Sequence, residues 1–175
     1  GNILPCSSKY RRMCRSTLAP SVSLLPMACT GSGPAWAPVI WVASAAVISL
    51  ARLVDAPLLL VHMSEIEAIE TLRQAQKKGL KIFGETCPQY IALTADDMDK
   101  PGVEGAMWCC SPPPRDSEAQ EAVWAGLKDG TFQTFSSDHA PYQFNAGGKI
   151  PKGDKTTFKE MANGVPGIEV LPVPA

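Results

Sequence analysis

Between residues 57 and 136, the spacing of apolar and polar residues predicts strands that alternate with helices. A continuous apolar run at residues 57–62 is typical of a strand that is buried on both faces, as in a parallel sheet. Residues 64–78 carry apolar side chains at the helical period, and residues 80–86 return to the composition of a strand. The change then repeats, so we expect a helix over residues 117–127 and a strand over residues 131–136.

Start and stop signals mark both expected helices. Ser64 and Glu67 have the spacing of a capping box, in which the serine hydroxyl bonds the glutamate amide and the carboxylate bonds back. Ser117 and Gln120 repeat this spacing before the second helix, and Gly79 suits the C-terminal cap of the first. The residues expected on the inner face of the first helix are Ile66, Ile69, Leu72 and Ala75.

The order strand, helix, strand, helix, strand predicts the α/β class, with a parallel sheet built from right-handed βαβ units. Reactive side chains follow the three strand ends, at residues 62–64, 84–90 and 136–142. In (β/α) barrels, active sites are built on the rim that the carboxyl ends of the strands form. We therefore expect His62 and Asp138 on one rim, with a single strand between them.

Residues 1–47 differ from the rest of the chain in composition. All 17 acidic residues lie at or beyond Asp55, and no charged residue occurs between Ser16 and Ala51. The stretch is rich in Pro, Ser and Gly and has no usable hydrophobic period, which predicts an irregular segment, non-native or disordered. A targeting peptide, a short membrane span at residues 35–51 and a truncated or out-of-frame reading all explain it, and we favour the third. Residues 48–175 are then the folded domain.

Charge and cysteine content narrow the classes of function. A net charge of −1 and the absence of a long basic run argue against a nucleic-acid or anionic-membrane surface. The six cysteines form no C-x-x-C pair, which argues against a structural zinc ribbon. Free thiols in a reducing compartment are the simpler interpretation, so we expect a cytoplasmic protein with no nucleic-acid or membrane partner.

Imidazole and carboxylate groups at strand ends suit zinc. Bound zinc lowers the pKa of water to about 7, and a nearby carboxylate can carry the proton to a leaving nitrogen, which amounts to amide hydrolysis. Simpler interpretations stay open, because His62 can be a rim histidine and Asp138 a helix cap. Cys87 is expected to be a buried apolar residue rather than a nucleophile. We expect residues 149–159 to form a solvated loop, the alternative being a mobile lid.

Five motifs occur in one order: LLVHMS at 59–64, GETCPQY at 84–90, CSPPPR at 110–115, FSSDHAPY at 135–142 and NGVPGIE at 163–169. On these motifs the chain resembles the dihydropyrimidinase and D-hydantoinase family of the amidohydrolase superfamily. The resemblance implies an incomplete TIM-like (β/α)8 barrel, of which the chain supplies about the sixth to the eighth strands and their helices.

The resemblance also implies residue roles. His62 matches a metal-ligating histidine, and Asp138 matches an aspartate that binds metal and shuttles the proton. Ser111 and Asn163 match positions whose backbone groups hold the ureide part of the substrate. The implied reaction is the opening of 5,6-dihydropyrimidines or 5-substituted hydantoins to N-carbamoyl amino acids, by a hydroxide held on a binuclear zinc centre. Relatives of this kind usually form homotetramers.

The chain departs from the family pattern in its metal ligands. The paired histidines of the family, its carboxylated lysine and a further histidine have no counterpart, because the chain contains two histidines only, His62 and His139. We therefore expect this chain, taken as a fragment, to be inactive by itself. Two alternatives remain: a non-catalytic dihydropyrimidinase-like interaction protein, or a sister cyclic amidase such as an allantoinase or a dihydroorotase. Retention of both His62 and Asp138 argues against the first alternative.

Overall fold

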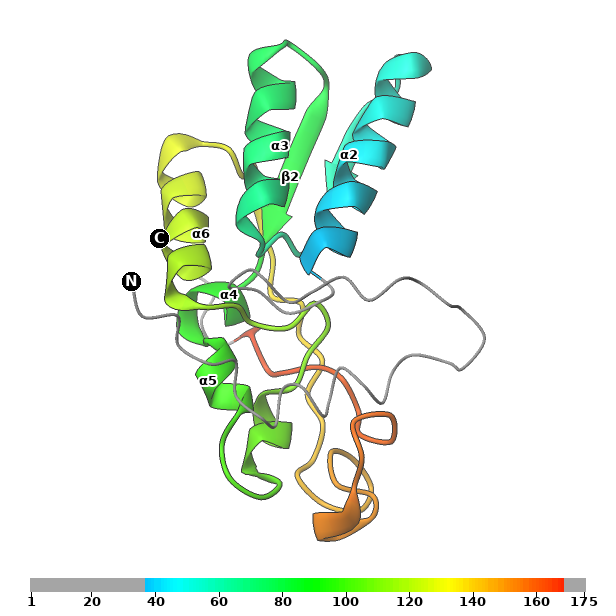
Figure 1. Ribbon diagram of the computed structural model, residues 1–175, viewed down its shortest axis with the longest axis vertical. Coiled ribbons are helices and arrows are strands. Elements are labelled where there is room, and N and C mark those ends of the chain that lie inside the picture. Colours follow the sequence, from blue (N-terminus) through cyan, green and yellow to red (C-terminus); the bar gives the residue numbers. More distant parts are fainter. Residues whose placement is uncertain (1–36, 169–175) are drawn as a thin grey trace.

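A computed structural model of the chain describes residues 37–168, with the side chains of residues 37–41 left aside. Three strands alternate with helices in the first part of this range, and short helices with irregular segments make up the rest (Figure 1). The elements are α2 (Ala37–Leu53), β1 (Leu58–Leu60), α3 (Ile66–Lys77), β2 (Ile82–Thr86), α4 (Gln89–Ala92), α5 (Ala95–Met98), η1 (Glu104–Trp108), α6 (Ser117–Asp129), β3 (Thr134–Phe135) and η2 (Gly153–Lys155).

The three strands form one parallel sheet in the order β1-β2-β3. Leu59 is paired with Phe83 across β1 and β2, and Glu85 is paired with Thr134 across β2 and β3. Consecutive strands are joined by α3 and by the long connection that ends in α6, as βαβ units require. The predicted α/β class and parallel sheet are confirmed.

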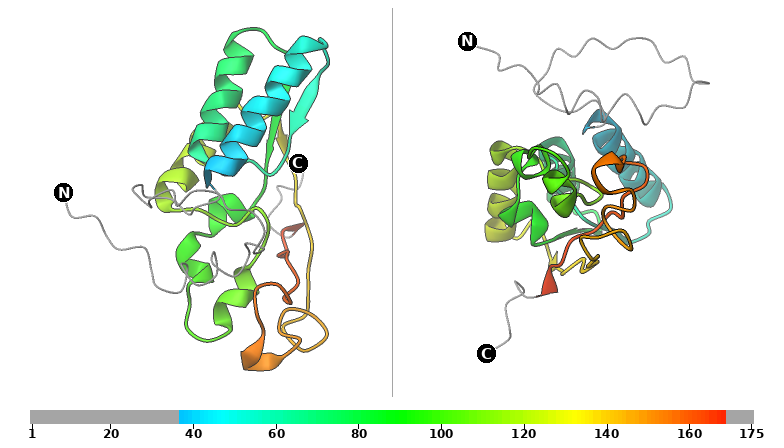
Figure 2. Two further views of the ribbon diagram at one scale, coloured as in Figure 1. Left: turned by 45° about the vertical axis from the view of Figure 1, so that its right-hand side comes forward. Right: turned by 90° about the horizontal axis from the view of Figure 1, so that it is seen from below.

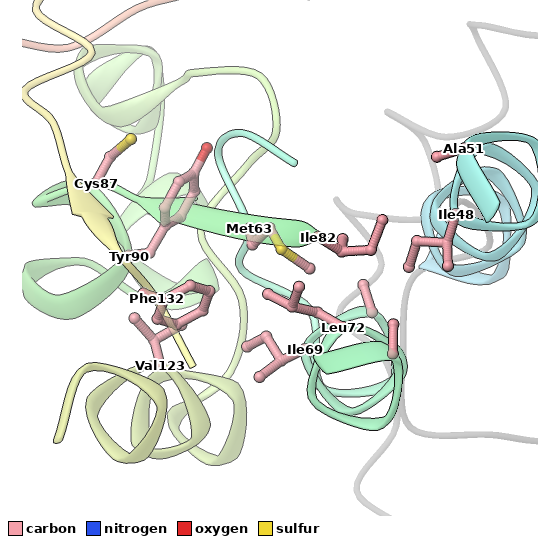
Figure 3. Close-up of a cluster of buried hydrophobic side chains, with 12 residues drawn as sticks. Ile48, Ala51, Met63, Ile69, Leu72, Ile82, Cys87, Tyr90, Val123 and Phe132 are labelled. Carbon is pink, nitrogen blue, oxygen red and sulfur yellow. The ribbon is translucent and has the colours of Figure 1, made fainter. Parts of the chain in front are cut away.

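The apolar core lies between the sheet and helices α2, α3 and α6 (Figure 3). Leu72 is fully buried and packs so closely on β2 that a Cβ atom at Gly84 would lie 2.3 Å from its Cδ2. Phe132 fills the space beside Gly126 of α6 in the same way, at 2.6 Å from an added Cβ. We call this part, the three strands with α2, α3 and α6, the helical layer.

The opposite face of the sheet is uncovered by any described element. Leu59 and Phe83, which are paired, are 46% and 43% exposed, and Val61 is 45% exposed. The expectation that the apolar run at residues 57–62 is buried on both faces is therefore wrong for residues 37–168. The physical reason is that helices cover one face only, so alternate side chains of β1 remain in contact with solvent.

Both helix starts differ from the predicted capping boxes. The cap of α3 is Glu65, whose carboxylate accepts bonds from the amides of Glu67 (3.3 Å) and Ala68 (2.9 Å). The cap of α6 is Asp116, which accepts from the Ala119 amide at 2.9 Å. The carboxyl oxygens of Glu65 and Asp116 accept bonds from free helix amides, so each acid replaces the neighbouring serine as the cap.

The predictions for the inner face and the C-terminal end of α3 agree with the structure, except at Ile66. Ile69, Leu72 and Ala75 of α3 are buried as expected, together with Ala68, whereas Ile66 is 38% exposed. Gly79 follows the end of α3 with a φ of +76°, a conformation that favours glycine.

The helix α2 begins 11 residues before the predicted domain start at residue 48, so residues 37–47 are not irregular. The uncharged run gave no amphipathic period, yet its alanines favour a helix, and Pro38 lies in the first turn, where no amide partner is lost. No helix between residues 37 and 168 is both long and apolar enough to cross a membrane. The remaining expectations for residues 1–36 lie outside the described residues.

Residues 87–116 and 136–168 form the second part of the molecule, which we call the loop region. It lies beyond the carboxyl ends of the strands and contains only short helices (Figures 1 and 2). The predicted solvated loop at residues 149–159 belongs here, and most of it is exposed. Lys149 is the exception, because it is only 2% exposed.

Candidate functional site

The carboxyl ends of the three strands are tied together by hydrogen bonds. The Met63 amide donates to the Glu85 carbonyl (2.9 Å), and the Thr86 hydroxyl donates back to the Met63 carbonyl (2.8 Å). The Ser136 amide donates to the Thr86 carbonyl (3.2 Å), and its hydroxyl donates to the buried Glu85 carboxylate. Residues that follow each strand are therefore held at one edge of the sheet.

His62 and Asp138 lie at this edge, on the strands that flank β2. His62 follows β1 and Asp138 follows β3, so one strand separates them, as predicted. Both are half-buried, and both have a left-handed backbone, with φ of +50° and +42°. Within residues 37–168, the one other non-glycine residue with positive φ is Asp55. A left-handed conformation turns the chain sharply after the strand, and such residues cluster at functional sites.

Asp138 is held by a side chain from the segment that directly follows β2. The Gln89 amide nitrogen, at the start of α4, donates to Asp138 Oδ2 at 2.7 Å. Gln89 is only 3% exposed. Its neighbour Tyr90 donates its phenol proton to the Pro112 carbonyl at 3.0 Å, next to Ser111. Burial raises the pKa of Tyr90, so the phenol stays a donor at neutral pH.

The two predicted substrate residues, Ser111 and Asn163, lie on segments that meet at Cys109. The Cys109 thiol donates to Asn163 Oδ1 at 3.1 Å, and the Gly164 amide donates to the Cys109 carbonyl at 3.0 Å. Ser111 is exposed and is joined to Pro112 by a cis peptide bond. Residues 54 positions apart in the sequence are thus brought together.

The segment after Asn163 also lies against Asp138. The Ala140 amide donates to the Val165 carbonyl at 3.1 Å, and a Cβ atom at Gly167 would lie 2.3 Å from the Ser137 carbonyl. His139 accepts bonds at Nδ1 from the Gly167 and Ile168 amides, at 3.1 and 3.2 Å. His139 therefore anchors this segment, and its Nδ1 carries no proton in this arrangement.

Lys149, the first residue of the predicted loop at 149–159, also contacts Cys109. Its ammonium donates to the Cys109 carbonyl at 2.5 Å, where the Gly164 amide also binds. Burial lowers the pKa of Lys149. The expectation that Lys149 belongs to a solvated loop is wrong, because a buried ammonium needs an acceptor and the Cys109 carbonyl supplies it.

The described cysteines are buried and uncharged. Cys87 is fully buried, with its sulfur 3.7 Å from the Ser136 hydroxyl, and burial raises its pKa to about 12. Burial likewise raises the pKa of Cys110 to about 12. A thiolate is the reactive form, so neither residue is a nucleophile at neutral pH. The prediction that Cys87 is a small apolar residue is confirmed.

The zinc that the resemblance implies does not fit the described residues alone. His62 and Asp138 have the right donor chemistry, but they make two ligands, whereas protein zinc sites have three or four. Between residues 37 and 168, no group of three or more His, Cys, Asp or Glu side chains could hold a metal ion. In addition, one oxygen of Asp138 is already bonded to Gln89.

Sequence reasoning missed Gln89 and Lys149 as residues of this site. Gln89 had a usable signal, because it lies within the GETCPQY motif directly after a strand end. Lys149 had none, because a lysine beside glycines in a polar segment is typical of exposed loops.

Comparisons with known proteins place this arrangement in a family. Over 122 residues the chain is 43% identical to the D-hydantoinase of Streptomyces coelicolor, a match that covers 70% of the chain and 26% of that protein. It is 40% identical over 120 residues to the D-hydantoinase of Geobacillus stearothermophilus, covering 69% of the chain and 25% of that protein. No family model matches the chain.

Solved structures agree with these matches. A dihydropyrimidinase from Brevibacillus agri superposes with a TM-score of 0.69 at 40% identity, covering 74% of the chain and 27% of that protein. A D-hydantoinase from Bacillus sp. AR9 gives the same TM-score and identity, covering 74% of the chain and 28% of that protein. The chain thus spans about a quarter of the length of these relatives. On sequence and fold together, it belongs to the D-hydantoinase and dihydropyrimidinase family.

Proposed function

We propose that this chain is part of a hydrolase that opens cyclic ureide rings, namely 5,6-dihydropyrimidines or 5-substituted hydantoins, to N-carbamoyl amino acids. The observation that carries the proposal is the position of His62 and Asp138 at the carboxyl ends of the strands that flank β2, in a chain 43% identical to a D-hydantoinase. We also propose that β1, β2 and β3 are the sixth to eighth strands of an incomplete barrel, and that its domain in this chain begins with α2 rather than at residue 48.

In this proposal each residue of the chain has a separate task. Hydrolysis adds hydroxide to the ring carbonyl carbon and a proton to the ring nitrogen, and the C–N bond between them breaks. Asp138 holds the proton taken from water and delivers it to the leaving nitrogen. The backbone groups of Ser111 and Asn163, which are brought together through Cys109, bind the ureide part of the ring. A zinc ion would supply electrostatic activation of water, with His62 and Asp138 as two of its ligands.

The described residues do not complete that metal site, so the proposal includes a second statement. The chain alone is expected to have no hydrolase activity, because two ligands do not make a zinc site. Ring opening of hydantoin or dihydrouracil by the isolated 175-residue chain would contradict this statement.

A chimera tests the proposed function directly. The segment of the Streptomyces coelicolor D-hydantoinase that matches this chain, 122 residues long, is replaced by the corresponding residues of this chain. We expect the chimera to open rings, tested on dihydrouracil, hydantoin, allantoin and dihydroorotate, with the first two preferred. Asp138→Asn should lower kcat by about 100- to 10,000-fold, whereas Asp96→Asn, at an exposed position of α5, should leave it unchanged.

Other outcomes of this experiment identify the alternatives. Preference for allantoin or dihydroorotate would assign the chain to a sister cyclic amidase. A folded chimera without activity would favour a non-catalytic interaction protein. The homotetramer that the resemblance implies and the cytoplasmic location expected from the cysteine content stay predictions.

A further inference from the structure

Gln89 is a buried polar residue whose position the sequence motifs alone do not explain. It begins α4, directly beyond the end of β2, and is 3% exposed. Its side-chain nitrogen donates to Asp138 Oδ2 at 2.7 Å across 49 residues of sequence. A bond from a buried amide to a carboxylate at this distance is charge-assisted, and such bonds are about twice as strong as neutral ones.

The orientation of the Gln89 amide follows from its partner. An ionised carboxylate only accepts hydrogen bonds, so the nitrogen of Gln89 and not its oxygen must face Asp138. The oxygen of Gln89 is buried and has no hydrogen-bond partner among the described residues. Leaving a buried amide oxygen unpaired costs free energy, so another contact of the Gln89 side chain must offset that cost. The contact with Asp138 is what compensates.

Gln89 also links Asp138 to the segment that carries Ser111. Tyr90 directly follows Gln89 in α4, and burial raises the pKa of its phenol, which therefore stays a hydrogen-bond donor at neutral pH. Tyr90 in turn donates to the carbonyl of Pro112, the residue after Ser111. The adjacent residues Gln89 and Tyr90 of α4 therefore bond to Asp138 on one side and to the carbonyl of Pro112, next to Ser111, on the other.

We propose that Gln89 is the positioning residue of the site: it fixes the Asp138 carboxylate relative to the Ser111 segment, so that the proton carrier and the bound ureide keep one geometry. The inference rests on the proposed function. Gln89 itself does not touch the reacting atoms and is not a catalytic residue. Its effect is on the orientation of Asp138, and misplacing a reacting group by about 1 Å can cost 100-fold in rate.

The contact is tested first in the complete 175-residue chain, by NMR of the glutamine side-chain amides. The Gln89 resonances are identified by their loss in Gln89→Met. Asp138→Asn removes the charge but keeps the size, and we expect it to shift the Gln89 amide protons strongly. The matched comparison is Gln120, whose side-chain nitrogen donates to the Leu93 carbonyl at 3.4 Å, and its resonances should stay in place. Equal, small shifts at Gln89 and Gln120 would overturn the proposal.

The function of the contact is tested in the chimera described above. Gln89→Met should lower kcat by about 10- to 100-fold with KM changed less than twofold, because orientation of a catalytic group acts on the chemical step. Gln120→Met should leave both constants unchanged. An unchanged kcat in Gln89→Met, or equal losses in both variants, would contradict the proposal.

The two measurements separate failure of this inference from failure of the proposed function. A chimera without activity before any substitution at Gln89 would count against the proposed function, and the NMR comparison would still decide whether Gln89 holds Asp138. If the isolated chain gives no dispersed spectrum, the kcat and KM of the chimera variants decide instead.

Discussion

Different interactions stabilise the helical layer and the loop region. In the helical layer, buried apolar side chains such as Leu72, Ile69 and Val123 fill the space between sheet and helices. In the loop region, polar groups from distant segments meet at a few points, above all at the Cys109 carbonyl and at Asp138. The difference matters for function, because the candidate site lies where the apolar layer ends and the polar contacts begin.

The largest expected effect is in the helical layer. Leu72→Ala removes a fully buried side chain that packs on Gly84, and should lower the free energy of unfolding by about 2 to 5 kcal/mol. Urea unfolding of the chain measures the loss. Leu53→Ala is the control, because Leu53 is 80% exposed and should change stability by less than about 0.5 kcal/mol. Equal losses of stability in the two variants would mean that packing in the helical layer is not what stabilises the fold.

A pH-dependent effect is expected at the boundary of the helical layer. Burial, followed by the hydrogen bond to the Glu67 carboxyl, raises the pKa of Glu65 from 4.5 to about 7. The folded state therefore binds the proton more tightly, and this contribution to stability is complete below pH 4.5 and lost as the pH rises through 7.

Glu65→Gln should abolish this pH dependence while keeping an acceptor for the amides of α3. Unfolding measured from pH 4.5 to 8 compares it with Glu121→Gln, an exposed residue of α6 that should retain the slope of the unsubstituted chain. If the free energy of unfolding of Glu65→Gln still falls as the pH rises, another titrating group causes the pH dependence.

The smallest effect is expected in the loop region. Lys149→Met removes one charge-assisted bond to the Cys109 carbonyl, worth about 1 to 3 kcal/mol locally. Hydrogen exchange of the Gly164 amide, which shares that carbonyl, should become faster, while amides of α3 should be unaffected. Lys159→Met, at an exposed position of the same loop, should change neither. A global loss of protection in Lys149→Met would show that the two parts do not open separately.

The same division explains what could be predicted from the sequence. Apolar periodicity gave the order of strands and helices, the parallel sheet and the position of His62 and Asp138 on either side of β2. It failed for the start of α2, because an uncharged apolar run has no contrast between faces. The capping-box spacing wrongly predicted Ser64 and Ser117 as the caps. Spacing alone does not show whether a serine or the adjacent acidic residue will accept the bonds from the helix amides.

Contacts in the loop region had no periodic signal at all. The burial of Lys149 and the bond from Gln89 to Asp138 depend on which distant segments meet, and sequence spacing does not record that. The approach of Asn163 to Cys109 is of the same kind. Polar networks built from irregular segments are therefore the part of a site that structure adds.

Zinc content tests the central claim most directly, namely that this chain supplies two ligands, His62 and Asp138, of a metal site that residues 37–168 do not complete. The isolated chain and the chimera are loaded with zinc, dialysed and analysed for metal, each with and without His62→Ala and Asp138→Asn. We predict that the chimera retains zinc and loses it with either substitution, and that the isolated chain retains none that depends on these two residues. Stoichiometric zinc on the isolated chain, lost on substituting His62 or Asp138, would contradict the account.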